Sequence, residues 1–388
     1  MPLASSPVCP PQGRLIAALL LLLPLIGCAG QAPRPSFSGL PQAEVAPPLP
    51  QIARTRVGLL LPLTGANRSL GQAMFNAAQL ALFDQADPRV EFLPEDTAGT
   101  PAGAAQATRQ ALGAGARVLA GPLTAPETAA AAGPARAGGL PLLAFTSDGA
   151  AAGNGVWVLG VTPSQQVDRM VAAGTTAGAQ RFALLGQDDE FGRRMAQALR
   201  TRLTGAGLPP PFVLLHPPRV DMAQAVRDIA NQAGEAPVDA LLLVETGLAA
   251  RNAAMAVPLV FPKPPRILGS VLWAQDTTLA QEPALAGAWF PGSDPQARQG
   301  FESRYQAAFG ERPPRLAGVA YDAAGLAARA ARDGGGALPV GEAFLGADGP
   351  LRLLPDGQVA RGLAVFALDP SGEPKLVEPA PVPGAAGS

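Results

Sequence analysis

Two acidic side chains are the residues of this sequence whose type and position most suggest chemistry. Glu245 ends a strongly apolar run, and Asp188 belongs to a polar turn. A pair of carboxylates can perform acid–base work on a glycan when their spacing is suitable, but nothing in the sequence fixes that spacing. Glu245 also suits an ammonium partner or a helix cap, and Asp188 suits a cation, an ammonium group or a capping turn.

The composition excludes most other kinds of site. The 388 residues include one histidine and two cysteines, and both cysteines lie within the first 28 positions. A His-rich metal site, a Cys-ligated zinc and a disulfide framework are therefore excluded. The sequence has no Gly-x-Ser-x-Gly, Gly-x-Gly-x-x-Gly or Gly-Lys-Ser/Thr motif. Most classes of enzyme are therefore excluded, and we expect no cofactor and no metal.

The charge balance argues against nucleic acid as a partner. The chain has 29 basic and 30 acidic side chains and no basic run. A phosphate backbone is recognised mainly by concentrated positive charge. We therefore expect no nucleic-acid binding.

The N-terminus has the pattern of a processing signal. Arg14 precedes an apolar run of 12 residues, Leu15–Ile26, which is too short to span a bilayer. Leu25-Ile26-Gly27-Cys28 looks like the bacterial lipobox, in which the cysteine is lipidated and becomes the first mature residue. We expect a signal peptide over 1–27, a lipid anchor on Cys28 as the only membrane contact, and a Pro-rich tether over 28–53. Ala29 favours the outer membrane if the source is Gram-negative.

Short apolar runs alternate with Ala-rich segments from residue 54 onward, which is typical of parallel sheets joined by right-handed crossovers. The predicted strands are Arg56–Leu61, Val90–Leu93, Arg117–Ala120, Leu140–Phe145, Arg181–Leu185, Phe212–Leu215, Ala240–Val244 and Arg266–Leu268. The predicted helices are Ser69–Asp84, Gly103–Gly113, Ala125–Ala137, Gln165–Ala177, Glu190–Leu203, Met222–Gln232, Leu248–Ala256, Pro295–Phe309 and Leu316–Arg332. A hairpin-like pair, Leu351–Leu354 and Leu363–Leu368, turns at Pro355-Asp356-Gly357. The same strand–helix order occurs twice, so we expect an α/β fold with two similar lobes.

Loops that leave the carboxyl ends of parallel strands line the ligand crevice of such folds. In the first half these loops carry small hydroxyl side chains, namely Thr64, Thr124, Thr146 and Ser147. In the second half they carry Asp188, Glu245 and Trp273. Trp273 either stacks on a ligand or belongs to the core. His216 is interpreted as a surface turn residue.

Several motifs resemble one protein family. Val57-Gly58-Leu59-Leu60-Leu61-Pro62-Leu63-Thr64-Gly65 is similar to the opening of the type I periplasmic solute-binding proteins of the branched-chain amino-acid-binding group. The turn Gln187–Gly192 and the run Ala320-Tyr321-Asp322-Ala323 also resemble motifs of that family. The resemblance covers about Arg56 to Leu368.

The resemblance implies two Rossmann-like lobes with parallel sheets, joined by three crossovers and closing around a ligand by hinge motion. We place the crossovers near Val161–Ser164, Phe290–Ser293 and Leu338–Gly341. Lobe 1 then comprises residues 54–162 and 292–339, and lobe 2 comprises 163–291 and 340–374. Residues 375–388 are expected to be a flexible tail.

The chain departs from amino-acid binders at the expected ligand positions. Leu70 and Phe191 stand where the family has tyrosines, and Ala125 stands where it has a serine. The cleft residues that remain are Thr64, Thr124, Thr146, Ser147, Asp188, Glu245 and Trp273. A ligand carboxylate would then be held by backbone N–H groups at the start of the helix that begins at Ala125. A ligand α-ammonium would pair with Glu245.

The same fold is used by the penicillin-binding-protein activators, which are outer-membrane lipoproteins that support a peptidoglycan synthase. This chain resembles the activators in three features: it has a lipobox, it has a Pro-rich tether, and it lacks several of the cleft hydroxyls of amino-acid binders. The sequence therefore favours a non-catalytic, lipid-anchored periplasmic activator with a peptidoglycan synthase as partner. The alternative is a substrate-binding lipoprotein of an ABC importer, which binds an amino acid or similar small polar solute and docks on an ABC permease.

Overall fold

The computed structural model of the chain describes residues 54–332 and 335–384. The predicted signal peptide, the lipidation site Cys28, the tether up to residue 53 and the last four residues lie outside this described part. Within it, none of the helices combines the length and the hydropathy that a membrane span requires.

The first lobe is built on a five-stranded parallel sheet in the order β2-β1-β3-β4-β5. Its strands are β1 (Thr55–Leu61), β2 (Val90–Asp96), β3 (Ala116–Ala120), β4 (Leu142–Ala144) and β5 (Val156–Val158). Its helices are α1 (Arg68–Gln85), α2 (Pro101–Gly113), α3 (Ala125–Ala137), α8 (Pro295–Phe309) and α9 (Ala317–Arg332). Strand β5 was not predicted from the sequence, because it is only three residues long.

Strand β1 shows how the sequence builds two cores. Successive side chains of a strand point to opposite faces. Val57, Leu59 and Leu61 therefore pack with α1 and α9, whereas Leu60 packs with α2 and α3 on the other face. Because both faces are covered by helices, the strand is apolar and buried from Val57 to Leu61, as is typical of parallel sheets.

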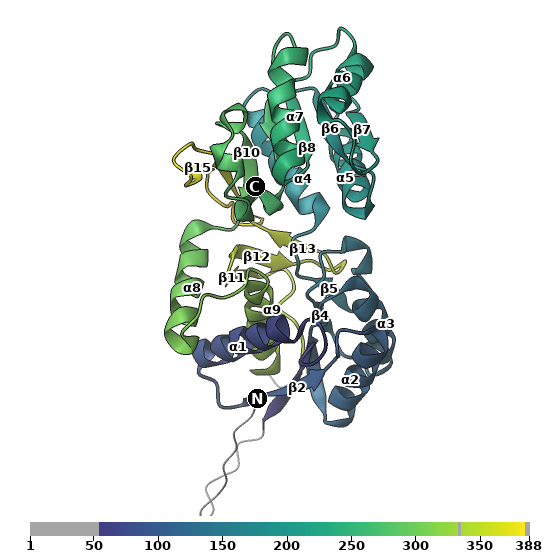
Figure 1. Cartoon of the computed structure of the whole chain (residues 1–388). Coiled ribbons are helices and arrows are strands. Elements are labelled where there is room, and N and C mark those ends of the chain that lie inside the picture. Colours follow the sequence, from purple (N-terminus) through teal and green to yellow (C-terminus); the bar gives the residue numbers. More distant parts are fainter. Residues whose placement is uncertain (1–53, 333–334, 385–388) are drawn as a thin grey trace, which may run out of the picture. The chain divides into compact units, whose positions relative to one another are not determined.

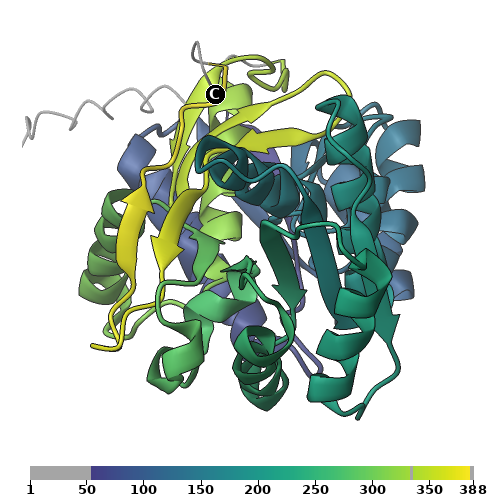
Figure 2. The same ribbon diagram turned by 90° about the horizontal axis from the view of Figure 1, so that it is seen from above.

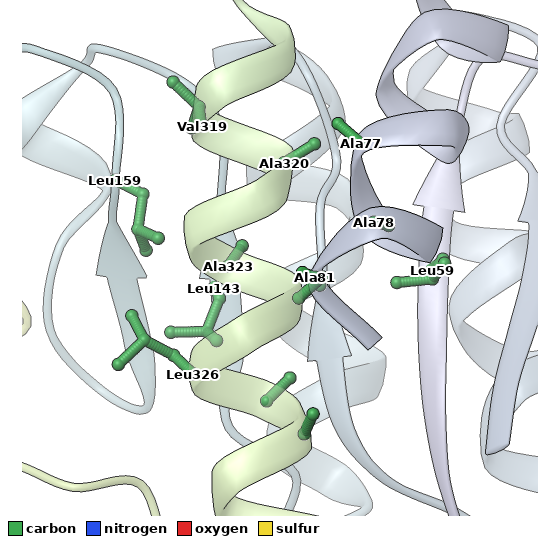
Figure 3. Close-up of a cluster of buried hydrophobic side chains, with 14 of the residues drawn as sticks. Leu59, Ala77, Ala78, Ala81, Leu143, Leu159, Val319, Ala320, Ala323 and Leu326 are labelled. Carbon is green, nitrogen blue, oxygen red and sulfur yellow. The ribbon is translucent and has the colours of Figure 1, made fainter. Parts of the chain in front are cut away.

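Helices α1 and α9 lie side by side in the first lobe (Figure 1). Their contact is made largely by alanines such as Ala77, Ala81, Ala320 and Ala323, all buried (Figure 3). Small side chains let the two helix axes approach closely. The Ala-rich composition of these segments therefore reflects helix packing as well as helix propensity.

The second lobe is built on a seven-stranded mixed sheet in the order β15-β14-β10-β9-β8-β6-β7. Its strands are β6 (Phe182–Gln187), β7 (Phe212–His216), β8 (Ala240–Val244), β9 (Arg266–Leu268), β10 (Trp289–Gly292), β14 (Ala364–Ala367) and β15 (Lys375–Glu378). Its helices are α4 (Pro163–Thr176), α5 (Glu190–Gly205), α6 (Met222–Ala233) and α7 (Gly247–Val260), with a 3-10 turn, η2, at Val271–Gln275. Helices α4 and α5 cover one face of this sheet, and α6 and α7 cover the other.

The C-terminal region differs from the sequence analysis. Strand β12 (Gly349–Leu353) pairs with β11 (Ala343–Gly346) and with β13 (Val359–Arg361), and Leu351 and Leu353 are buried in the first-lobe core. The partner of β12 in the hairpin is therefore β13, not the 363–368 run. That run supplies β14, which joins the second-lobe sheet.

Two boundaries move as a result. Residues 343–361 pack on the first lobe, so the third passage between lobes lies at residues 362–363, not near Leu338–Gly341. Residues 375–378, expected to be part of a loose tail, form β15 at the edge of the second-lobe sheet (Figure 2). The apolar residues Leu376 and Val377 lie in this short strand. It was not predicted because prolines, which are typical of loose segments, surround it in the sequence.

Candidate functional site

A cavity of about 670 Å³ lies among loops of both lobes, which is within the usual range of small-ligand sites. Its first-lobe walls come from the loops after β3 and β4, and its second-lobe walls come from the starts of α4 and α5 and from η2. Apolar side chains dominate the lining, namely Leu70, Leu123, Phe145, Val161, Phe191, Val271, Leu272, Leu316, Val319 and Leu363.

Three of the seven predicted cleft residues line this cavity: Thr124, Thr146 and Ser147. Thr146 is buried, and its hydroxyl oxygen accepts a hydrogen bond from the backbone N–H of Asp148. Ser147 is exposed. The structure thus brings together the hydroxyls of β3 and β4, as the carboxyl ends of neighbouring parallel strands should.

Thr64 and Asp188 do not line the cavity. The Thr64 hydroxyl donates to Asp96 Oδ2 at 2.6 Å, within a turn in which the same carboxylate also accepts from the backbone. Asp188 forms an exposed ion pair with Arg193 at 2.7 Å. Both side chains hold their own loops together.

Glu245 and Trp273 are also outside the cavity lining. Glu245 is 9% exposed, and its Oε1 lies 3.0 Å from Nε2 of His216. Burial raises the pKa of Glu245, while the nearby imidazole opposes that shift. Trp273 is 2% exposed and donates from Nε1 to the Glu245 carbonyl at 2.7 Å. Trp273 thus takes the core position that the sequence left open.

His216 is buried at 6% exposure and is not the surface turn residue expected from the sequence. It ends β7, next to β6, and its ring contacts Glu245 at the end of β8. It is the one buried residue of β7, whose four preceding residues are half-buried. The acid predicted to meet a ligand ammonium therefore has an internal partner.

The N-terminus of α3 is the place where a ligand carboxylate was expected, and the protein fills it with its own carboxylate. Glu127 is 0% exposed, and its Oε2 accepts from the Thr124 backbone N–H at 3.0 Å and from the Thr124 hydroxyl at 2.7 Å. Its Oε1 accepts from the Thr97 hydroxyl at 2.7 Å. The pattern Thr-x-x-Glu is a capping box that the sequence analysis did not use.

Polar residues missed by the sequence analysis complete the cavity. Arg315 lies in the loop before α9, and its Nη1 donates to the Val271 carbonyl of the second lobe at 2.8 Å. Gln166 of α4 accepts the Val271 backbone N–H at 3.1 Å. Asp348 also lines the cavity, but its Oδ1 accepts from Ser293 at 2.8 Å and from Arg298 at 3.3 Å. Arg315 lies shortly before the family-like run Ala320-Tyr321-Asp322-Ala323, which was the available signal for it.

Comparison with known proteins decides the family. The sequence profile of a family described as periplasmic binding protein matches residues 54–364. The chain belongs to this periplasmic binding protein family. Its fold, with parallel sheets in two lobes, is the type I fold of that family. A search of curated proteins found none similar to this binding protein.

Solved structures share the fold of this periplasmic binding protein at low identity. A Rhodospirillum rubrum protein assigned to a branched-chain amino acid ABC transporter has a TM-score of 0.73 at 21% identity, over 84% of this chain and 100% of that one. A Rhodopseudomonas palustris ABC transporter solute-binding protein, in complex with 3,4-dihydroxybenzoic acid, has a TM-score of 0.59 at 19% identity, over 85% and 99%. Full-length LpoA from Haemophilus influenzae has a TM-score of 0.67 at 18% identity, over 84% of this chain and 59% of that one.

Direct contacts link the two lobes of the binding protein. Arg194 of α5 forms a two-point ion pair with Asp148 of the first lobe, with Nη2 to Oδ2 at 2.8 Å. The Arg194 guanidinium lowers the pKa of Asp148. Together with the bond from Arg315 to Val271, this pair joins the first lobe to the second.

Proposed function

We propose that this periplasmic binding protein is a non-catalytic, lipid-anchored protein that supports peptidoglycan synthesis, in the manner of the penicillin-binding-protein activators. The observation that carries the proposal is the buried Glu127 carboxylate at the N-terminus of α3. A helix N-terminus attracts one carboxylate through its free N–H groups and dipole. A ligand carboxylate at the same place would meet a like charge and would find the N–H groups of Thr124 and Glu127 already engaged.

The remaining amino-acid recognition groups support the same proposal. Glu245 would have to leave His216 to meet an ammonium group, and its raised pKa disfavours the charged form that such a partner needs. The Thr64 hydroxyl is bonded to Asp96. The α-carboxylate and the α-ammonium of an amino acid would therefore each lack the partner expected for it.

Partner and location follow from the same proposal. The partner is a peptidoglycan synthase, bound through the protein surface, while the lipid on Cys28 holds the protein at the periplasmic face of a membrane. The outer membrane is the favoured location in a Gram-negative cell. The membrane is contacted through the anchor alone.

Deletion of the gene in its own host tests this role. We expect the deletion strain to show a lower fraction of cross-linked muropeptides and unchanged uptake of radiolabelled amino acids. Complementation with the full chain should restore cross-linking, and complementation with the Cys28→Ser variant should restore it only partly. Normal cross-linking together with a loss of amino-acid uptake would contradict the proposal.

A second candidate function is that of substrate-binding protein for an ABC importer. The cavity of about 670 Å³ favours it, because a protein that acts only through its outer surface has no need of such a site. In that case the deletion strain would lose uptake of one solute and keep normal peptidoglycan. The two candidates thus predict opposite results in the same strain.

A further inference from the structure

Arg315 combines a fixed position with unused hydrogen-bonding capacity at the cavity. One guanidinium nitrogen, Nη1, is held by the Val271 carbonyl at 2.8 Å. In the described part of the chain, its Nε and Nη2 have no bonded partner. A guanidinium carries five N–H donors and stays charged in proteins. Arg315 therefore offers a charged donor pair to a ligand.

Gln166 supplies a second donor at the same wall. The side chain is 2% exposed and lines the cavity. Its Oε1 accepts the Val271 N–H at 3.1 Å, which fixes which end of the amide is the oxygen. Among the described residues, no group accepts a hydrogen bond from its Nε2. Because the residue lines the cavity and its Oε1 is already engaged, the Nε2 hydrogens are available to an acceptor in the cavity.

Both side chains are hydrogen-bonded to the backbone of Val271: Gln166 accepts from its N–H, and Arg315 donates to its C=O. The two donor groups are therefore neighbours on one wall. A carboxylate has two oxygens and accepts several hydrogen bonds, so it matches this pair better than a single carbonyl does.

The other cavity groups select against an ammonium group. The first-lobe wall combines apolar side chains such as Phe145 and Leu123 with the hydroxyls of Thr124, Thr146 and Ser147, and apart from Asp348 it carries no acidic residue among those that the structure describes. Asp348 is the acidic residue in the lining, and its side chain is 9% exposed and already pairs with Arg298 and Ser293. An ammonium group in the cavity would lose its hydration without gaining a free acidic partner.

We propose that this cavity binds a small monocarboxylate with an apolar body and no ammonium group, whose carboxylate accepts hydrogen bonds from Arg315 and Gln166. The site is independent of which of the two proposed roles the protein fulfils. In the activator role the acid would be an effector, and in the importer role it would be the transported solute.

Calorimetric titration of the purified protein with matched probes tests the site. The probes are 4-methylpentanoate, its neutral amide, and leucine, which has the same carbon skeleton and adds an ammonium group. Benzoate tests whether an aromatic body is also accepted. We expect 4-methylpentanoate to bind, and the amide and leucine each to bind about tenfold more weakly or worse. This comparison needs no substitution, so it does not depend on a variant folding correctly.

Variants then assign the contact. Arg315→Gln should weaken 4-methylpentanoate binding by about tenfold or more and reduce the preference over the amide. Arg312→Gln is the matched control, because Arg312 is exposed in the same loop and is not part of the lining; its affinity should stay unchanged. Far-UV circular dichroism of each variant verifies the fold. The proposal is overturned if neither acid binds, if leucine binds as tightly as 4-methylpentanoate, or if the folded Arg315→Gln variant keeps full affinity.

Discussion

Glu127 gives the most direct test of how the α3 N-terminus is closed. Its carboxylate accepts three hydrogen bonds from Thr97 and Thr124, and it is 0% exposed. Glu127→Ala removes half of a capping box, which costs about 1 kcal/mol, and leaves buried donors without acceptors at about 1–3 kcal/mol each. Because the two hydroxyls can rotate to other acceptors but the Thr124 N–H cannot, we expect a total loss of about 3–5 kcal/mol in the free energy of unfolding.

Glu127→Gln separates the hydrogen bonds from the charge. The amide oxygen can replace Oε2 and accept from Thr124, while the amide nitrogen can donate to the Thr97 hydroxyl. We therefore expect a loss of about 1 kcal/mol.

Urea unfolding followed by circular dichroism measures both changes. Glu235→Gln, at an exposed position, is the control and should shift stability by less than about 0.5 kcal/mol. If Glu127→Ala costs no more than Glu127→Gln, the carboxylate does not close the helix end and the reasoning is refuted.

Three further predictions concern ion pairs and the core, and urea unfolding reads each of them. Because Arg194 lowers the pKa of Asp148, the pair stabilises the fold above pH about 4, and that contribution disappears as the pH falls through the folded-state pKa. Asp148→Asn should cost about 1 kcal/mol at pH 7, and the difference from the unaltered protein should shrink at pH 3; a constant difference would contradict this. Asp322→Ala should lower the free energy of unfolding by about 3–5 kcal/mol, because it leaves the buried guanidinium of Arg361, whose side chain is 1% exposed, without its acidic partner. The double variant that also carries Arg361→Met should recover most of that loss. Phe301→Ala should cost about 3–5 kcal/mol, since Phe301 is fully buried in the first-lobe core, and a loss below about 1 kcal/mol would mean that the site collapses without a cavity.

The regular part of the fold was predictable because the sequence carries its periodicity strongly. The residues Val57–Leu61 of β1 and the whole of β8 are continuous apolar runs followed by helices, and this pattern is typical of a parallel sheet. The C-terminal strands were harder. Nothing local in Leu363–Leu368 shows that it pairs with β10 in the other lobe, because that pairing depends on long-range packing.

The candidate site was predictable only where topology decides it. Thr124, Thr146 and Ser147 follow neighbouring parallel strands, so they had to lie at one sheet edge. Glu245 also follows a parallel strand, but it is buried and its carboxylate lies against His216, which ends β7, two strands away in the sheet. Contacts of this kind decide whether a side chain lines the cavity or bonds to a neighbouring residue. They cannot be recognised in a single sequence. Arg315 reaches the cavity from a loop after α8, where no strand end pointed to it.

The central claim, that this binding protein supports peptidoglycan synthesis and does not serve as an amino-acid receptor, is tested most directly by reconstitution. The host's own bifunctional peptidoglycan synthase is incubated with labelled lipid II, with and without the full-length protein, and cross-linked product is quantified over time. We predict a faster rate of cross-linking when the protein is present, with no change when leucine is added. An unchanged rate at saturating protein would contradict the account.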